Sequence, residues 1–144
     1  MITTDSIIIN ARLSKVYATA RNIEKQHEFI PGYKPAEVFK SAEGHLIVNR
    51  IAEIGGKTMK WQSIVLFNEN RSIEFEQIEG RLKGMTISWL FEEVPEGTRL
   101  TITHSLKLVI PVLGYFIERF AAKPAIDKLT TNVLKGLKNK MEGN

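Results

Sequence analysis

The sequence predicts an α+β fold in which a curved antiparallel sheet of about seven strands wraps around one long C-terminal helix. Two observations lead to this prediction. Segments of alternating apolar and polar residues follow one another as far as Leu108, separated by short turns, which is typical of an antiparallel sheet with one dry face. From about Pro111 onwards, apolar residues recur at helical spacing instead. Such a stripe must cover an apolar surface, and only the inner face of the sheet offers one.

The first part of the chain predicts one strand followed by two short helices. Residues 2–9 begin as a strand, which ends at Asn10 and Ala11. Helical spacing then connects Leu13, Val16, Tyr17, Ala20 and Ile23. A second short helix is expected over 23–29, where Pro31-Gly32 interrupts it.

Six further strands are expected as a meander. They cover residues 36–41, 47–54, 58–67, 72–79, 82–93 and 98–108. The clearest turn between them is Gly55-Gly56, because both glycines tolerate a positive φ and a two-residue hairpin needs it. Pro95-Glu96-Gly97 marks another turn.

The alternation also predicts which side chains point towards the helix. The inward set is Met59, Trp61, Ser63, Val65, Phe67, Ile73, Phe75, Gln77, Met85, Ile87, Trp89, Phe91, Leu100, Ile102, His104 and Leu106. The outward set contains Lys60, Gln62, Glu74, Glu76, Thr86, Ser88, Thr101 and Thr103. One face of the sheet is therefore expected to be dry and the other wet.

The helical stripe consists of Leu113, Phe116, Phe120, Ile126, Leu129, Val133 and Leu137. Pro124 interrupts it, and we expect a kink there or a break after Ala122. The segment 109–123 is expected to be more mobile than the central strands, and to act as a lid together with the turn 29–33.

Composition sets the broad class. A chain of 144 residues is expected to form one domain, 1–144, with its own core. It has no cysteine, and we see neither a signal peptide nor an apolar stretch of the roughly 20 residues that a membrane span needs. These features favour a cytoplasmic protein with no stable membrane insertion.

The net charge of +4 includes five lysines of the C-terminal helix: Lys123, Lys128, Lys135, Lys138 and Lys140. A basic helix is compatible with binding to nucleic acid or to an anionic membrane. A solvated helix face, with lysines that complement the helix dipole, is the favoured explanation. No aromatic residues are interleaved with these lysines, as a single-strand binder would need, so no nucleic-acid partner is expected.

Three motifs resemble the START/birch-pollen-allergen (SRPBCC) superfamily, and more narrowly its polyketide cyclase/dehydrase and coenzyme Q-binding branch. The first comprises residues 11–17 (ARLSKVY), 22–24 (NIE) and 29–33 (FIPGY); the second is 80–91 (GRLKGMTISWLF), and the third is 97–103 (GTRLTIT) ahead of the long helix. The resemblance covers essentially the whole chain. Arg12-Leu13 stands where the family commonly has proline, and Asn22 replaces the family's aspartate. The resemblance implies a helix-grip fold with a ligand cavity, and it implies no fixed catalytic set.

A cavity between sheet and helix would be lined by large apolar side chains with a few polar ones. The expected apolar walls are Trp61, Phe75, Met85, Trp89, Phe91, Phe116 and Phe120. The alternative is that these residues simply fill the core.

Four polar residues are the sharper candidates. His104 lies between apolar neighbours, so it is either a satisfied core histidine or a group that bonds a ligand carbonyl or moves a proton near neutral pH. Ser63 and Gln77 point the same way and would orient a ligand oxygen. If Gly55-Gly56 is a two-residue turn, Arg50 pairs with Trp61 and its guanidinium stacks on the indole at the cavity mouth. A longer loop would turn Arg50 outwards.

Other chemistry finds little support in the sequence. His27, His45 and His104 lack metal-ligand spacing. Glu74 and Glu76 share the wet face, and neither a phosphate loop nor a nucleophile elbow is present. No metal and no cofactor are therefore expected, and no catalytic residue is assigned.

Three functions remain open. The chain binds or carries a hydrophobic small molecule such as a lipid, quinone or polyketide-like compound; or it is a cyclase/aromatase in which His104 and Arg50 polarise carbonyls; or it is an interaction module with a filled core. The sequence leaves the oligomeric state undetermined.

Overall fold

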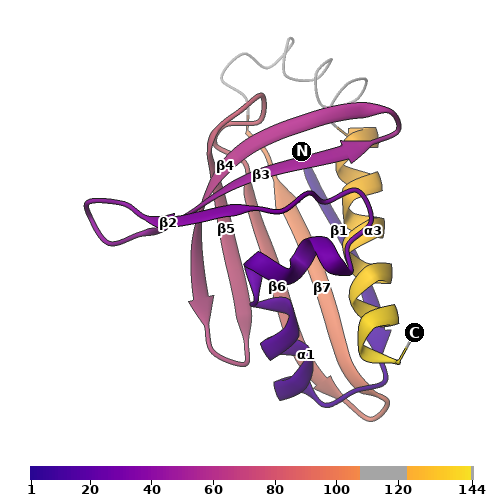
Figure 1. Ribbon diagram of the computed structural model, residues 1–144. Helices are drawn as coiled ribbons and strands as arrows, with labels where there is room; N and C mark the ends of the chain where they lie inside the picture. Colours follow the sequence, from indigo (N-terminus) through magenta and orange to yellow (C-terminus); the bar gives the residue numbers. More distant parts are fainter. Residues whose placement is uncertain (108–122, 144) are drawn as a thin grey trace.

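The computed structural model describes residues 1–107 and 123–143, and it has the predicted α+β architecture (Figure 1). The strands are β1 (Ile2–Ile9), β2 (Glu37–Lys40), β3 (Leu46–Ile54), β4 (Lys57–Asn68), β5 (Ser72–Glu79), β6 (Thr86–Val94) and β7 (Gly97–Ser105). The helices are α1 (Leu13–Ala20), the 3₁₀ helix η1 (Ile23–Glu28) and α3 (Lys123–Met141). The strand, two short helices, meander and C-terminal helix thus follow in the expected order.

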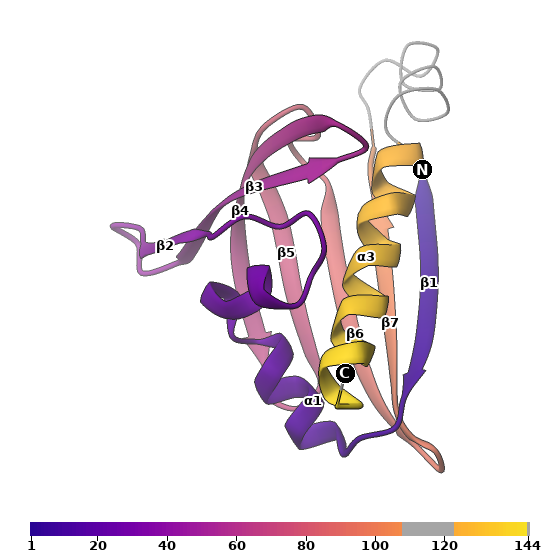
Figure 2. The same cartoon turned by 45° about the vertical axis from the view of Figure 1, so that its right-hand side comes forward.

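All seven strands belong to one antiparallel sheet, in the order β1-β7-β6-β5-β4-β3-β2. The meander runs from β2 to β7, and β1 then pairs with β7 along its whole length, from Ile2 opposite Ser105 to Ile9 opposite Thr98. The sheet is strongly bent, and α3 lies inside the bend, alongside β1 (Figure 2). This is the helix-grip arrangement.

The predicted inner and outer faces of the sheet are confirmed. Ile73 and Leu100 are completely buried, and Trp89 and Ile102 nearly so. On the opposite face, Lys60, Glu76 and Thr86 are exposed. Period-2 alternation in an antiparallel sheet covered on one side accounts for this division.

The start of β6 differs from the prediction. The segment 82–93 was expected to be one strand, but β6 begins at Thr86. The chain turns first: Met85 N donates to Leu82 O at 2.9 Å, and Gly84 N donates to Gln77 O at 2.8 Å. These bonds close a turn that the apolar residues Leu82 and Met85 concealed, because they made the segment look like the start of the strand.

The C-terminal helix is described from Lys123, so Pro124 lies in the first turn of α3 as described. A proline is tolerated in a first turn, where its missing N–H has no intrahelical partner. Three predictions concern residues outside the described ones. They are the break after Ala122, the mobility expected for 109–123 as far as Ala122, and the stripe positions Leu113, Phe116 and Phe120.

The short helix α1 is fixed to the sheet by Tyr17. This side chain is completely buried, its hydroxyl donates to Ser72 O at 3.0 Å, and its ring meets that of Phe91 edge-on at 5.2 Å. The contact satisfies a buried hydroxyl and places an aromatic pair at one end of the concave face.

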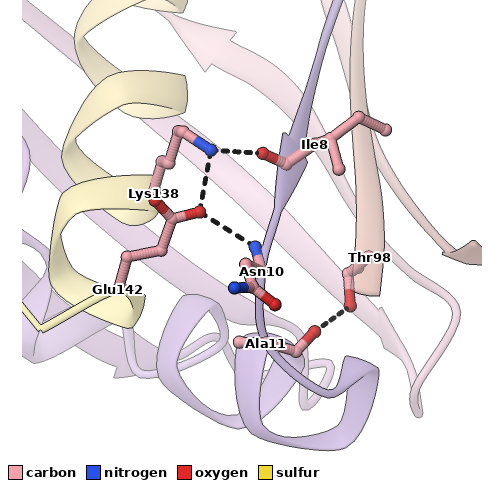
Figure 3. A network of polar contacts seen from close by, with 6 residues as sticks. All are labelled: Ile8, Asn10, Ala11, Thr98, Lys138 and Glu142. Atoms are coloured by element: carbon pink, nitrogen blue, oxygen red, sulfur yellow. Dashed lines mark hydrogen bonds and ion pairs between the residues drawn. The ribbon is translucent and has the colours of Figure 1, made fainter. Parts of the chain in front are cut away.

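The C-terminal end of α3 is held to the end of β1 by a polar network (Figure 3). Lys138 Nζ donates to Ile8 O and to the Glu142 carboxylate, both at 2.7 Å. Asn10 N donates to the same carboxylate at 2.9 Å. The hydrogen bond from Asn10, and then Lys138, lower the pKa of Glu142. Beside this network, the Thr98 hydroxyl donates to Ala11 O at 2.8 Å, joining β7 to the segment before α1.

Gly136 brings α3 into direct contact with the chain that follows η1. A Cβ at this position would overlap Phe29 O and approach Ile30 Cα at 3.1 Å. Both neighbours are backbone atoms, which cannot rotate away as a side chain can. Only glycine therefore fits between α3 and the 29–30 segment.

We expect Gly136→Ala to destabilise the protein by about 1–3 kcal/mol, the usual cost of overpacking. In a helix interior free of such contacts, this change stabilises by up to about 1 kcal/mol, so the sign is diagnostic. Urea denaturation measures the effect. Lys135→Ala, at the exposed neighbouring position, is the control and should stay within about 0.5 kcal/mol of the parent. A Gly136→Ala protein as stable as the parent would contradict the close packing.

Candidate functional site: a cavity between the sheet and α3

A cavity of about 1180 Å³ lies between the concave face of the sheet and α3. Strands β3 to β7 form one wall, and residues of α3 from Pro124 to Val133 form the other. Gln26 of η1 and Tyr33, in the connection before β2, contribute to the border. The cavity exists because one helix covers only part of a bent seven-stranded sheet.

Eight of the side chains that the sequence nominated line this cavity: Arg50, Trp61, Ser63, Phe75, Gln77, Met85, Trp89 and His104. They come from β3, β4, β5, β6, β7 and the turn before β6, and they are far apart in sequence. The sheet brings them together because each occupies an inward position of its strand.

Three nominated residues are not placed there. Phe91 is buried and inward-facing, but it packs against Tyr17 near α1 and does not line the cavity. Its position along β6 is too close to the end of the sheet that α1 covers. Phe116 and Phe120 lie outside the described residues.

Two aromatic pairs form much of the apolar wall. Phe75 and Trp89 lie on the neighbouring strands β5 and β6, with ring centroids 5.2 Å apart. Trp61 on β4 meets Tyr33 edge-on at 6.3 Å. Such rings offer large, rigid apolar surfaces, and tyrosine adds a polar edge. Both tryptophans of the chain belong to this wall.

Arg50 is the one arginine of the described residues that is buried, with 4% of its surface exposed. The two-residue turn at Gly55-Gly56, with φ of 58° and 79°, sets the register, and Arg50 pairs with Trp61 as expected. Its side chain differs from the expectation in one respect. The guanidinium lies over the ring of Tyr33, with Cζ 4.4 Å from the centroid, rather than on the indole of Trp61.

Hydrogen bonds hold Arg50 in this position. Nη2 donates to Gln26 Oε1 at 2.6 Å, and Nη1 donates to Lys34 O at 3.3 Å. Burial lowers the pKa of Arg50, against an opposing influence of Tyr33, and burial likewise raises the pKa of Tyr33. No carboxylate among the described residues forms an ion pair with this guanidinium. The cavity therefore has a buried cation held by neutral partners.

Ser63, Gln77 and His104 provide neutral polar groups. Ser63 and Gln77 are opposite each other on β4 and β5, beside a bulge where Ile78 is the extra residue. His104 lies opposite Ile87 on β6 and is 7% exposed. Its Nδ1 has no hydrogen-bond partner within the described part of the chain. A buried, unpartnered ring nitrogen is available to a ligand.

Burial lowers the pKa of His104 to about 4, although the charge of Asp127 opposes the shift. The imidazole is therefore neutral near pH 7. A neutral ring both donates and accepts a hydrogen bond, whereas the proton transfer near neutral pH that the sequence suggested needs a pKa close to 7. The environment favours hydrogen bonding over that role.

Several lining residues were not among the candidates taken from the sequence. Gln26 was missed because a glutamine in a short helix carries no apolar periodicity, yet it is 1% exposed and bonds Arg50. Tyr33 was noted only as part of a turn. Lys57, Lys60, Arg81 and Lys128 are exposed and contribute to the border of the cavity; their proximity to one another depends on the fold, so local pattern did not reveal it.

Two further features concern metal binding and membrane insertion, in residues 1–107 and 123–143. No group of three or more histidine, cysteine, aspartate or glutamate side chains there is arranged to hold a metal ion. No helix in this part of the chain is long and apolar enough to cross a membrane.

We expect the free energy of unfolding to decrease as the pH falls from 6.5 towards 4, in part through His104. The folded-state pKa lies below the ordinary value of 6.5, so in this window the unfolded state binds a proton that the folded state does not. Urea denaturation across this range, together with NMR titration of the imidazole, measures the effect. His104→Asn should show a weaker pH dependence than the parent, whereas His45→Asn, at an exposed position, should retain it. An imidazole that titrates near 6.5 in the folded protein would contradict this environment.

Comparison with known proteins supports the same architecture. Among solved structures, TTHA0849 from Thermus thermophilus is similar, with 21% identity, a TM-score of 0.81, and coverage of 99% of this chain and 97% of that one. The Zhui aromatase/cyclase from Streptomyces sp. R1128 is similar with 15% identity, a TM-score of 0.82, and coverage of 99% and 93%. The di-domain ARO/CYC BexL of the BE-7585A biosynthetic pathway has 18% identity and a TM-score of 0.80; the match covers all of this chain and 50% of BexL. At these identities the likeness shows the fold alone.

No curated protein sequence matches the chain. A family model does match, over residues 9–132, and it describes polyketide cyclases/dehydrases and lipid-transport proteins. The matched region begins at the last residue of β1 and extends into α3, so it includes almost every element that borders the cavity. The chain belongs to the polyketide cyclase/dehydrase and lipid-transport family.

Proposed function

We propose that this protein binds and carries a hydrophobic small molecule, such as a lipid, quinone or polyketide-like compound, in the cavity between the sheet and α3. The observation that carries the proposal is a large hollow with aromatic walls in place of a filled core. Small-molecule sites usually combine such walls with a few placed polar groups. Ser63, Gln77, His104 and Arg50 are those groups here.

Two features favour carrying over catalysis. His104 is neutral near pH 7, and within the described residues no carboxylate is hydrogen-bonded to its Nδ1 to tune it as a proton carrier. Arg50 is held by Gln26 and by a backbone carbonyl, which positions it as a hydrogen-bond donor. These groups can orient a ligand without a covalent step.

A cyclase/aromatase is the second candidate. It is favoured by the presence of Arg50 and His104 on the same cavity and by the names of the similar aromatase/cyclase structures. In this case the cavity would fold a polyketone, and hydrogen bonds from Arg50 and His104 would stabilise negative charge that develops on its carbonyl oxygens. The cavity argues against the third possibility, an interaction module with a filled core.

A polyketone substrate distinguishes the two candidates. The carrier predicts binding without turnover. The cyclase predicts a cyclised product, detected by mass spectrometry and absorbance, with turnover reduced by about a hundredfold or more when His104 becomes Ala, as for loss of one stabilising donor. Turnover unaffected by His104→Ala would remove this residue from the chemistry.

We also propose that the protein acts in the cytoplasm. The cysteine-free composition agrees with a reducing cytoplasm.

Occupation of the cavity is expected to change the fluorescence of Trp61 and Trp89, because both border it. Titration with an apolar ligand, and native mass spectrometry of the protein purified from cells, measure this directly. Ser63→Leu introduces volume at a buried cavity position and should weaken ligand binding by about tenfold, as expected when packing is perturbed by about 1.4 kcal/mol.

The matched control is Thr86→Leu, which places the same side chain on the exposed face of the neighbouring part of the sheet. It should leave binding unchanged. Equal affinities of the two variants, or tryptophan fluorescence that is insensitive to every apolar compound tested, would contradict the proposed site.

A further inference from the structure

The described charged residues that border the cavity are all basic: Arg50, Lys57, Lys60, Arg81 and Lys128. Lys60 alternates with the inward residues Met59 and Trp61, so its side chain belongs to the outer face of β4. No aspartate or glutamate of the described residues borders the cavity. The whole chain, in contrast, has 20 basic and 16 acidic residues. Acidic residues are therefore common in the sequence, but none of the described ones borders the cavity.

Nearby carboxylates pair with other cations. Asp127, adjacent to Lys128 in α3, accepts a hydrogen bond from Lys123 at 2.7 Å. Glu53, on β3, pairs with Lys34 at 3.6 Å. The cations on the cavity have no ion-pair partner among the described residues. No direct ion pair among the described residues neutralises these cations, and a cleft with low-dielectric walls concentrates the field of such charges.

Arg50 is the deepest of these charges. It is 4% exposed, and its hydrogen-bond partners are the side-chain amide of Gln26 and the backbone carbonyl of Lys34, both neutral. A guanidinium has five N–H donors in a planar fork that fits a carboxylate or phosphate, and these two bonds leave part of the fork unused. Because a buried cation without a countercharge is unfavourable, an anion bound here would compensate it.

We propose that the cavity selects amphiphiles that carry an anionic group, a carboxylate or a phosphate, which pairs with Arg50 while the apolar tail lies along Trp61, Phe75 and Trp89. The exposed cations at the border attract the anion and raise its rate of entry. This inference rests on the proposed ligand-binding function and adds the charge of the ligand to it.

The test compares three ligands with the same tail: decanoate, decyl phosphate and 1-decanol, titrated against the tryptophan fluorescence of the unmodified protein at about pH 7.5 and low salt. At this pH the carboxylate is ionised, since its ordinary pKa is about 4–5. We expect at least one anion to bind about tenfold or more tightly than the alcohol, as expected for a buried charge pair. The two anions distinguish a carboxylate ligand from a phosphate ligand.

Arg50→Gln should remove this preference while the alcohol still binds. Arg50→Lys keeps the charge but loses the planar fork, so it should give an intermediate preference. Binding of the alcohol reports that the cavity of each variant is intact. If neither variant folds, the relative affinities of the unmodified protein for the anions and the alcohol still test the inferred charge preference.

The border cations are tested separately. Lys57→Gln, Arg81→Gln and Lys128→Gln together should slow association with the anions and weaken its salt dependence, because border charges act mainly on association rates. The control combines Lys15→Gln, Lys40→Gln and Lys135→Gln. It makes the same change in net charge at exposed positions away from the cavity, and association should stay as fast as in the parent.

The results distinguish failure of the inferred ligand charge from failure of the carrier function itself. If all three ligands bind with equal affinity, or if Arg50→Gln retains the full preference for the anion, the inference about charge is overturned and the hydrophobic-carrier function stands. If neither the anions nor the alcohol bind, the carrier function itself fails. Loss of binding for the alcohol alone in the Arg50 variants would also overturn the assignment of Arg50 to the anion.

Discussion

The register of the β3–β4 pair is the constraint on which the cavity depends. Gly55-Gly56 forms a two-residue hairpin turn between Ile54 and Lys57. Both glycines take positive φ values that other residues rarely adopt. The turn fixes Arg50 opposite Trp61 and Val48 opposite Ser63. A slip of one residue would exchange the faces of β3 relative to the rest of the sheet, and the only buried guanidinium of the described residues would then point into water.

A second constraint is that one helix must cover a bent sheet of seven strands. On the side of η1, α3 packs closely against the chain, as Gly136 against the 29–30 backbone shows. At the α1 end, Tyr17 and Phe91 fill the concave face. Between these two packed regions, aromatic rings and four polar groups border the cavity without filling it. The described side chains are thus packed more closely at the margins than at the centre, where the candidate site lies.

Much of this architecture could be predicted from sequence because the relevant information is local. Alternation within each strand identifies the inward residues, and it placed Ser63, Gln77 and His104 correctly on the dry face despite their polarity. The two glycines of one turn made an inward Arg50 one of two alternatives, and the register of β3 and β4 decides for it. The stripe of Ile126, Leu129, Val133 and Leu137 marked the face of α3 that is turned towards the sheet, and all except the half-buried Leu129 are buried.

The features that the sequence did not predict depend on contacts between segments that are distant in the chain. Gln26 is buried where it bonds Arg50 of β3 and the backbone of Ala20, and neither Gln26 nor Arg50 indicates the other in the sequence. The aromatic partner of Arg50 is Tyr33 rather than Trp61, since the path of the chain after η1 decides which ring lies over the guanidinium. The strand β6 starts four residues later than expected because Gly84 and Met85 bond back within a turn. The lowered pKa of His104 likewise reflects the surroundings of the ring and not its neighbours in the chain.

The network of Lys138, Glu142 and Asn10 determines where α3 is attached to the sheet (Figure 3). It anchors the C-terminal end of the helix. About half a turn earlier, Gly136 packs directly against the backbone of residues 29–30. Every residue of α3 that borders the cavity precedes both contacts, from Pro124 to Val133. The residues that anchor the end of α3 and those that border the cavity therefore lie on different parts of the helix. A substitution in the Lys138–Glu142 network would alter the seam between α3 and β1 without changing a side chain of the cavity wall.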